Sequence, residues 1–262
     1  MKPFLAAVAF LTRIPVPSRA VIGPGDVGRA AKWFPLVGLF LGAAAVGMLC
    51  ALTPLFPVDV AAVLVVLAEA LLTGALHMDG LADMADGFGG GRDREHTLAI
   101  MRDHAVGSYG TVAVVLLIAL KVTAIGALVA RPHWWVYLLL APMLGRWATL
   151  PLMRFVPYAR GSSSIIDNMH TAELVWGSAA AAVACVAVGR LSGLICWAAV
   201  LLATLAFGRY CKRKIGGITG DTLGANVQIC ECIVLLAGLA FSESSARLWV
   251  ARFPELYGPW LP

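Results

Sequence analysis

The chain has 262 residues, of which 60% are hydrophobic and only 13% are charged, and its formal net charge is +5. Soluble globular domains average about 45–50% apolar and about 25% charged residues. A soluble protein of this length cannot bury such an apolar excess, so the composition excludes a soluble enzyme, a disordered chain and a disulfide scaffold. It leaves a polytopic helical membrane protein.

The elements expected first along the chain are a short interfacial helix over residues 4–13 and then seven apolar runs, each long enough to cross a bilayer. The seven runs lie at about residues 34–53, 58–76, 109–130, 134–152, 172–189, 191–207 and 223–241. The two runs on either side of Gly189-Arg190 form either a short helical hairpin or one long bent segment. The predicted fold class is therefore all-α: a polytopic integral membrane helical bundle with about seven transmembrane helices. Residues 1–262 make one integral membrane domain.

The basic residues indicate how these spans are oriented. With a cytoplasmic N-terminus, the segments on the cytoplasmic side hold 14 of the 20 Lys and Arg residues. Those segments are residues 1–33, 77–108, 153–171 and 208–222. Basic loops stay on the cytoplasmic side of membranes, so we expect a multi-pass protein whose N-terminus and loops 77–108 and 208–222 face the cytoplasm.

Acidic residues cluster in the loop 77–108, which holds six of the 15 Asp and Glu residues. Asp79, Asp83 and Asp86 are spaced so that on a helix they share an arc of about 60°. Three neighbouring carboxylates repel one another unless a cation neutralises them. Mg²⁺ prefers such oxygen ligands and is often shared with substrate phosphates. The stripe therefore predicts a Mg²⁺ site, and the plainer alternative is a solvated helix face.

Two further polar stretches are candidates for binding an anion. The glycine run 87–91 either exposes backbone N–H groups or ends a helix, and Arg102 follows it. The stretch 212–226 contains Gly217, Thr219 and Asp221, a composition that favours close approach of backbone to an anion. The alternative for this stretch is a basic anchor followed by the N-cap of a helix.

Five ionisable side chains leave alternatives open. Glu69, Lys121, Arg146 and Glu231 lie inside predicted spans. Unpaired charge costs several kcal/mol there, so each must face the interior, a cavity or a partner. Ion pairing and substrate contact are equally compatible with that pattern. His77 is either an interfacial histidine at a helix end or a substrate contact.

Five motifs, taken together and in order, resemble one family, the cobalamin synthases, also called adenosylcobinamide-GDP ribazoletransferases. The motifs are Phe10-Leu11-Thr12-Arg13-Ile14-Pro15-Val16-Pro17, Trp33-Phe34-Pro35-Leu36-Val37-Gly38, His77-x-Asp79-Gly80-Leu81-Ala82-Asp83-x-x-Asp86-Gly87, Ile100-Met101-Arg102-Asp103-His104-Ala105-Val106-Gly107-Ser108-Tyr109-Gly110 and Gly216-Gly217-Ile218-Thr219-Gly220-Asp221-Thr222-Leu223-Gly224-Ala225. His104 is the one departure, because the family more often has a small polar residue at that position.

The resemblance implies a Mg²⁺-dependent enzyme of the cell inner membrane that acts late in cobalamin biosynthesis. It would join adenosylcobinamide-GDP to α-ribazole or α-ribazole 5′-phosphate, giving adenosylcobalamin or its 5′-phosphate and GMP. On this hypothesis Asp79, Asp83 and Asp86 hold the metal, and Asp86 or Asp103 accepts the proton of the attacking 5′-hydroxyl of α-ribazole. The candidates for substrate binding are Arg13, His77, Arg102, Gly217, Thr219 and Asp221. Nucleic acid is not an expected partner, and the sequence leaves a homo-oligomer open.

Two other kinds of function compete with this reading. A transporter or cation-binding protein would use the charges within the spans as a pathway at the membrane midplane. A CDP-alcohol-type lipid phosphotransferase would use a similar aspartate motif with a different acceptor. The concentration of acids in loops, and not at span centres, argues against the transporter.

Overall fold

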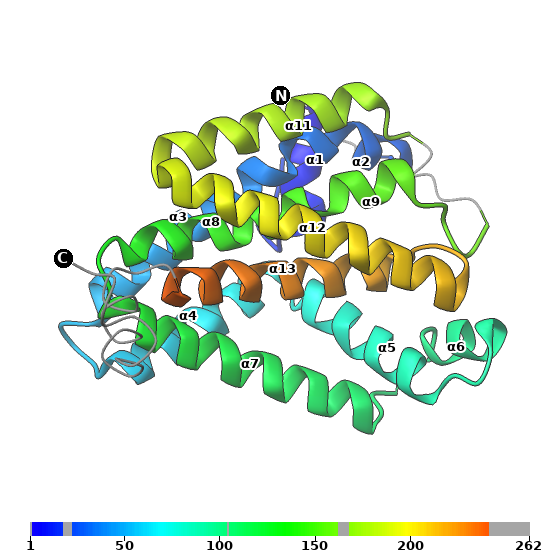
Figure 1. The fold of residues 1–262 in the computed structure, drawn as a ribbon, viewed down its shortest axis with the longest axis horizontal. Helices are drawn as coiled ribbons and strands as arrows, with labels where there is room; N and C mark the ends of the chain where they lie inside the picture. Colours follow the sequence, from blue (N-terminus) through cyan, green and yellow to red (C-terminus); the bar gives the residue numbers. More distant parts are fainter. Residues whose placement is uncertain (1, 18–22, 104, 162–167, 241–262) are drawn as a thin grey trace, which may run out of the picture.

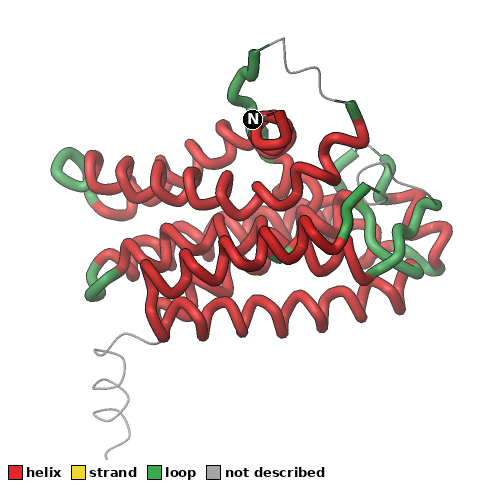
Figure 2. The backbone as a smooth tube through the Cα atoms, turned by 90° about the horizontal axis from the view of Figure 1, so that it is seen from above, coloured by secondary structure: helices red, strands yellow, loops and turns green. Residues whose placement is uncertain are grey.

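The computed structural model describes residues 2–17, 23–103, 105–161 and 168–240, and within these ranges the regular elements are helical (Figure 2). The departure at His104 lies outside the described residues. In chain order the elements are α1 (Lys2–Leu11), α2 (Pro24–Ala30), the 3₁₀ turn η1 (Ala31–Trp33), α3 (Phe34–Leu52), α4 (Val58–Thr73), α5 (Leu76–Gly90), α6 (Arg94–Ile100), α7 (Ser108–Val129), α8 (Trp134–Trp147), α9 (Thr149–Phe155), α11 (Thr171–Ala184), the π-helical turn η2 (Cys185–Gly189), α12 (Arg190–Ile215) and α13 (Gly220–Ala240).

Membrane-spanning helices dominate the fold. Among the described residues five segments are long and apolar enough to cross a bilayer, and the bent pair α4 and α5 makes a sixth if it is counted as one span. The five are Gly25–Leu52, Ser108–Val129, Trp134–Phe155, Thr171–Ile215 and Gly220–Ala240. Five or six long apolar helices are typical of a multi-pass membrane protein, and they confirm the predicted all-α bundle. The predicted number of seven spans is approximate.

The segment Thr171–Ile215 turns back on itself (Figure 1). Arg190 has a φ of 49°, and a Cβ placed on Gly193 would overlap the backbone carbonyl of Cys185. Residues eight apart in a straight helix are separated by about 12 Å along its axis, so this contact requires a reversal of direction. Of the two alternatives open in the sequence, the structure contains the hairpin.

The break between α4 and α5 changes the direction of the chain by 90°. Gly74 and Ala75 both adopt left-handed backbone angles, with φ of 63° and 55°. The Arg13 N–H donates to the Leu72 carbonyl at 2.7 Å, and the Arg13 side chain packs across Gly74 so tightly that a Cβ there would overlap it. The span expected at 58–76 therefore ends at Thr73, and α5, which carries the aspartate stripe, continues at about a right angle to α4.

Glycines let the central helices approach closely. A Cβ on Gly38 or Gly42 of α3 would overlap the backbone of α8 at Pro142 or Leu139. Small residues at helix crossings are what permit such close packing in membranes. As a result α8 is buried along nearly its whole length, and it forms the centre of the bundle together with α13.

The two ends of the bundle differ in character. At one end, on the right in Figure 1, lie α5 and α6, the connection after α9 and the connection between α12 and α13. The turns after α3, α7 and η2 lie at the opposite end. A short parallel bridge between Tyr158 and Ile218 joins two connections of the first end. Much of the segment 77–108, expected as a loop, is in fact helical, because α5 and α6 occupy it.

Candidate functional site

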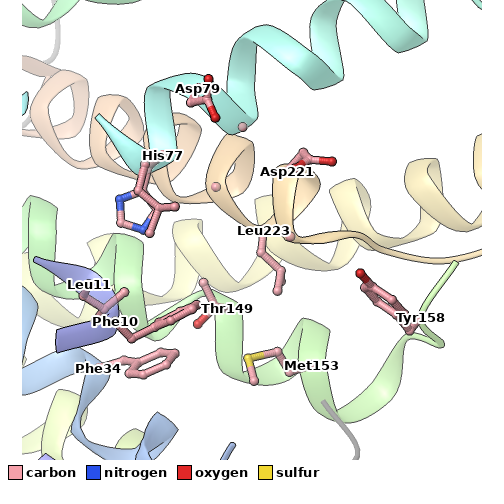
Figure 3. A pocket seen from close by; sticks show the side chains of 14 residues that line it. Phe10, Leu11, Phe34, His77, Asp79, Thr149, Met153, Tyr158, Asp221 and Leu223 are labelled. Carbon is pink, nitrogen blue, oxygen red and sulfur yellow. The ribbon is translucent and has the colours of Figure 1, made fainter. Parts of the chain in front are cut away.

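A pocket of about 250 Å³ lies between α1, α3, α5, α9 and α13 (Figure 3). Its lining draws on four of the five motifs that carry the family resemblance. Phe10 comes from the first, Phe34 from the second, Asp79 from the third and Asp221 from the fifth. Residues up to about 210 positions apart in the sequence thus meet at one place, which makes this pocket the candidate active site.

One wall of the pocket is apolar. It consists of Phe10, Leu11, Phe34, Leu76, Met153 and Leu223. The rings of Phe10 and Phe34 are stacked, with centroids 5.8 Å apart and planes inclined by 14°. Ligand pockets are mostly apolar with a few placed polar groups, and in this one the two carboxylates, Asp79 and Asp221, lie along the edge above the apolar side chains (Figure 3).

The polar rim exists because α5 and α13 cross at glycines. A Cβ on Gly80 would lie 2.8 Å from the carbonyl oxygen of Asp221, and one on Gly224 would lie 3.2 Å from the Cα of His77. Larger side chains at either position would push the two helices apart. The close crossing brings the side chains of Asp79 and Asp221 to the same edge of the pocket (Figure 3).

Asp221 is held through one of its two oxygens. Oδ2 accepts hydrogen bonds from Arg160 Nη2 at 3.0 Å and from Thr219 Oγ1 at 3.2 Å. Arg160 also donates to the Met101 carbonyl at 3.3 Å, so it ties α13 to the motif at residues 100–110. No hydrogen bond from the described part of the chain reaches Oδ1. Oδ1 is therefore the free oxygen of a carboxylate whose orientation is set.

Arg160 was missed by reasoning from the sequence. It stands in the 153–171 segment, where it counts only as one more basic residue on the predicted cytoplasmic side. No spacing or neighbouring motif marks it. Its importance comes from the tertiary structure, because the bridge between Tyr158 and Ile218 sets its loop beside the start of α13.

Asp79 and Asp83 add two further carboxylates near Asp221. Asp79 is exposed and its carboxylate accepts no hydrogen bond from other described residues, whereas Asp83 is half-buried and does not line the pocket. Burial and then the charges of Asp79 and Asp221 raise the pKa of Asp83 to about 6. The three carboxylates therefore repel one another at neutral pH, and a cation would relieve that repulsion.

The donor set suits a metal only in part. Over the described ranges, no three His, Cys, Asp or Glu side chains are grouped closely enough to hold an ion by themselves. Mg²⁺ usually takes one or two carboxylates and completes its shell with water and substrate phosphates. The rim at Asp79 and Asp83 fits that pattern, with ligands of the right chemistry but too few of them without substrate.

Asp86 lies on α5 as its spacing predicts, but its carboxylate is bonded to the start of α7. It is buried, and its Oδ2 accepts the Gly107 N–H at 2.7 Å while its Oδ1 accepts the Gly110 N–H at 2.9 Å. Both N–H groups belong to the N-terminal end of α7, where they have no partner within the helix. The helix dipole also favours a carboxylate at this end. Asp86 is not among the residues that line the pocket, and both of its oxygens are already bonded.

The remaining predicted residues divide between the pocket and its supports. Arg102 and Asp103 are exposed, and Asp103 Oδ1 accepts the Ala105 N–H at 3.2 Å. A Cβ on Gly217 would overlap the Pro157 carbonyl, so this glycine permits the bridge between the two connections. Thr219 caps the start of α13. None of these four, nor Arg13, lines the pocket, although Arg13 supports the bend at which α5 begins.

His77 joins the pocket to a buried set of charges. It lines the pocket at 5% exposure, and its Nδ1 lies 3.5 Å from Arg146 Nη2. Arg146 also bonds Glu231, and Lys121 Nζ lies 2.6 Å from Glu231 and 2.7 Å from Glu69. The two cations and two anions balance. Of the two alternatives for these four residues, the structure therefore shows ion pairing.

Comparison with known proteins adds independent information. Residues 3–239 match the model of a family described as cobalamin-5-phosphate synthase. Curated relatives named adenosylcobinamide-GDP ribazoletransferase include a Sinorhizobium medicae protein, 40% identical over 242 residues, covering 87% of this chain and 92% of the relative. A Pseudomonas fluorescens relative is 39% identical, covering 92% and 100%, and one from Pseudomonas paraeruginosa is 42% identical, covering 90% and 97%. No solved structure matches.

Proposed function

This chain belongs to the cobalamin-5-phosphate synthase family, and we propose that its transferase reaction takes place at the rim of the pocket, where Asp79 and Asp221 lie with Asp83 close by. The chain is a membrane transferase that joins adenosylcobinamide-GDP and ribazole, the activity for which its relatives are named. The transporter and lipid phosphotransferase alternatives are not favoured. The observation that supports the location is the meeting of four family motifs around one pocket.

The chemistry sets what the rim must do. A ribose hydroxyl of ribazole attacks the phosphorus attached to cobinamide, a new P–O bond forms, and the bond to the bridging oxygen breaks to release GMP. Where ribazole 5′-phosphate is the acceptor, its 5′ oxygen is already esterified, so the attacking hydroxyl is another one on the ribose. The site must accept one proton and stabilise the negative charge of the departing phosphate.

Asp221 is our proposed proton acceptor. Its Oδ1 is free while Oδ2 is held by Arg160 and Thr219, which is the arrangement needed to receive a proton in a fixed direction. Asp86, the earlier candidate, has both oxygens occupied at the start of α7. Asp103, the other candidate, is exposed and does not line the pocket. Arg160 is in addition a guanidinium within reach of a phosphate brought to this rim.

A divalent cation is the proposed cofactor, and Mg²⁺ is the ion that fits the ligands. Asp79 and Asp83 would hold it, and the closeness of their carboxylates to each other and to Asp221, which would repel one another without a cation, supports an ion there. When bound, Mg²⁺ would neutralise diphosphate charge and so favour the departure of GMP.

We also propose that the protein lies in the cell inner membrane. The end of the bundle that carries α5, α6 and the connection between α12 and α13 would face the cytoplasm. The last turn of α12 carries Lys212, Arg213 and Lys214 at this end, and basic residues mark the cytoplasmic side. The nucleotide substrate and GMP would then be on the side of the membrane where nucleotides are made.

The test is GMP release from purified protein, with Mg²⁺ titrated, in Asp221→Asn, Asp79→Asn and Asp83→Asn. Loss of a general base lowers kcat by about 10²- to 10⁴-fold, which we expect for Asp221→Asn. Asp79→Asn and Asp83→Asn should raise the Mg²⁺ concentration needed for half-maximal rate. Asp59→Asn, in the first turn of α4, is the matched control and should behave as wild type. Near-normal kinetics in all three rim variants would refute the location.

A further inference from the structure

The pocket is small compared with one of the two substrates. It holds about 250 Å³, whereas drug-sized ligands occupy pockets of roughly 300–1,000 Å³. A corrin ring with its amide side chains and adenosyl ligand is larger than a drug-sized molecule. The largest part of either substrate that the pocket can enclose is a nucleoside. The two candidates for the pocket are therefore ribazole and the guanosine of GDP, which differ in their base.

The chemistry of the apolar wall distinguishes these two bases. Guanine carries an exocyclic amine, a carbonyl and a ring N–H, and burying such groups unpaired is costly. The wall beside the stacked Phe10 and Phe34 consists of Leu11, Leu76, Met153 and Leu223. Thr149, the hydroxyl on this side, already donates to the Arg146 carbonyl at 2.8 Å. A benzimidazole has an apolar carbon edge and a single ring nitrogen that accepts a hydrogen bond, so its burial leaves fewer polar groups without partners.

The arrangement of the pocket also gives the bound nucleoside a direction. Figure 3 shows Phe10 and Phe34 at one end, Tyr158 at the other, and the side chains of Asp79 and Asp221 along the edge above. A base lying against the aromatic pair places its ribose under these carboxylates. The hydroxyl that attacks is then next to the proposed proton acceptor.

We infer that the pocket is the acceptor subsite: its apolar wall binds the benzimidazole base of ribazole, while the corrin ring and the guanine of adenosylcobinamide-GDP stay outside it. This inference rests on the proposed function. On this inference, the side chains of Phe10, Phe34, Met153 and Leu223 determine which base the ribazole substrate can carry. Aromatic rings stack with an offset at distances like that of the observed pair, so a third flat ring can extend the stack.

Gly220 offers a way to obstruct the pocket. It lines the cavity, its φ is not in the left-handed region, and a Cβ placed on it would meet no atom within 4 Å. Gly220 is exposed, so Gly220→Leu should add bulk at the mouth of the cavity without displacing the backbone. Gly47, in α3, has equally open surroundings away from the pocket, so Gly47→Leu is the matched control.

The experiment measures KM for each substrate separately and also the equilibrium binding of ribazole without the second substrate. Gly220→Leu should raise both the KM and the Kd for ribazole by about tenfold or more, the size expected when a pocket rejects a ligand by one or two carbons. The KM for adenosylcobinamide-GDP should not change. Gly220→Ala should show a smaller effect in the same direction. It replaces Gly220→Leu in the test if the leucine variant does not fold.

Met153→Ala tests the same wall by enlarging it. The variant should shift kcat/KM towards ribosides with a larger base, such as naphthimidazole riboside, by about tenfold relative to benzimidazole riboside. A rise in KM for adenosylcobinamide-GDP alone, or competition by guanosine for ribazole binding, would overturn the inference. Unchanged base preference in Met153→Ala would overturn it as well. Absence of GMP release in wild-type protein that still binds ribazole would instead count against the proposed function.

Discussion

Replacing Lys121 by methionine tests whether the charges inside the bundle are held as a neutral set. Lys121 has a side-chain exposure of 3% and bonds both Glu69 and Glu231. Removing one partner from a buried pair costs about 3–5 kcal/mol, because the remaining charge is left uncompensated. In a protein of about this size 1 kcal/mol corresponds to about 2–4 °C in Tm. We therefore expect Lys121→Met to lower Tm by about 10 °C.

A second variant separates charge balance from the loss of a side chain. Lys121→Met combined with Glu69→Gln removes one cation and one anion and leaves the pair between Arg146 and Glu231. This double variant should recover most of the lost stability. Lys212→Met removes an exposed lysine at the end of α12 and should leave Tm close to that of wild type.

The assay is thermal unfolding of the purified protein in detergent micelles, followed by tryptophan fluorescence at one scan rate for all variants. Two results would refute the reasoning. One is a Tm for Lys121→Met equal to that of wild type, and the other is a double variant no more stable than the single one. Either result would mean that the four side chains are not electrostatically coupled in the folded protein.

Three other predictions concern residues that support the site. Asp86→Ala removes the acceptor for both the Gly107 and the Gly110 N–H groups and should cost about 1–3 kcal/mol, measured as a lower Tm. The kcat for GMP release should be unchanged, and a large loss of kcat in folded protein would return Asp86 to the reaction. Gly217→Ala would place a Cβ against the Pro157 carbonyl and should lower GMP release and Tm together, whereas wild-type values would disprove the close approach. Gly42→Val in α3 would press on the backbone of α8 and should cost about 1–3 kcal/mol in thermal unfolding, and an unchanged Tm would contradict that helix crossing.

The helical position of the aspartates could be predicted because it follows from local spacing. Asp79, Asp83 and Asp86 do lie on one helix, α5, as their separations indicate. Their partners could not be predicted in the same way. Asp86 is bonded to Gly107 and Gly110, and Asp221 lies 142 positions beyond Asp79, so each environment depends on a helix that is distant in the chain.

Arg160 shows the limit of reading a chain by motif. In the sequence it is one of many basic residues, and its pairing with Asp221 arises only after two connections come together at Tyr158 and Ile218. The bend at Gly74 is similar. A glycine within an apolar run is common in membrane helices, and only its packing against Arg13 shows that the helix ends there.

The sequence by itself determined the class of the protein and its family. An apolar excess must face lipid, helices satisfy their own backbone in lipid, and the motifs stand in a recognisable order. The tertiary structure alone decided which polar residues share a pocket. Hydropathy and periodicity report on neighbours within a few turns, whereas the pocket depends on glycine crossings such as Gly80 of α5 against Asp221 of α13. Such crossings are set by how closely two distant surfaces can approach, which no local pattern encodes.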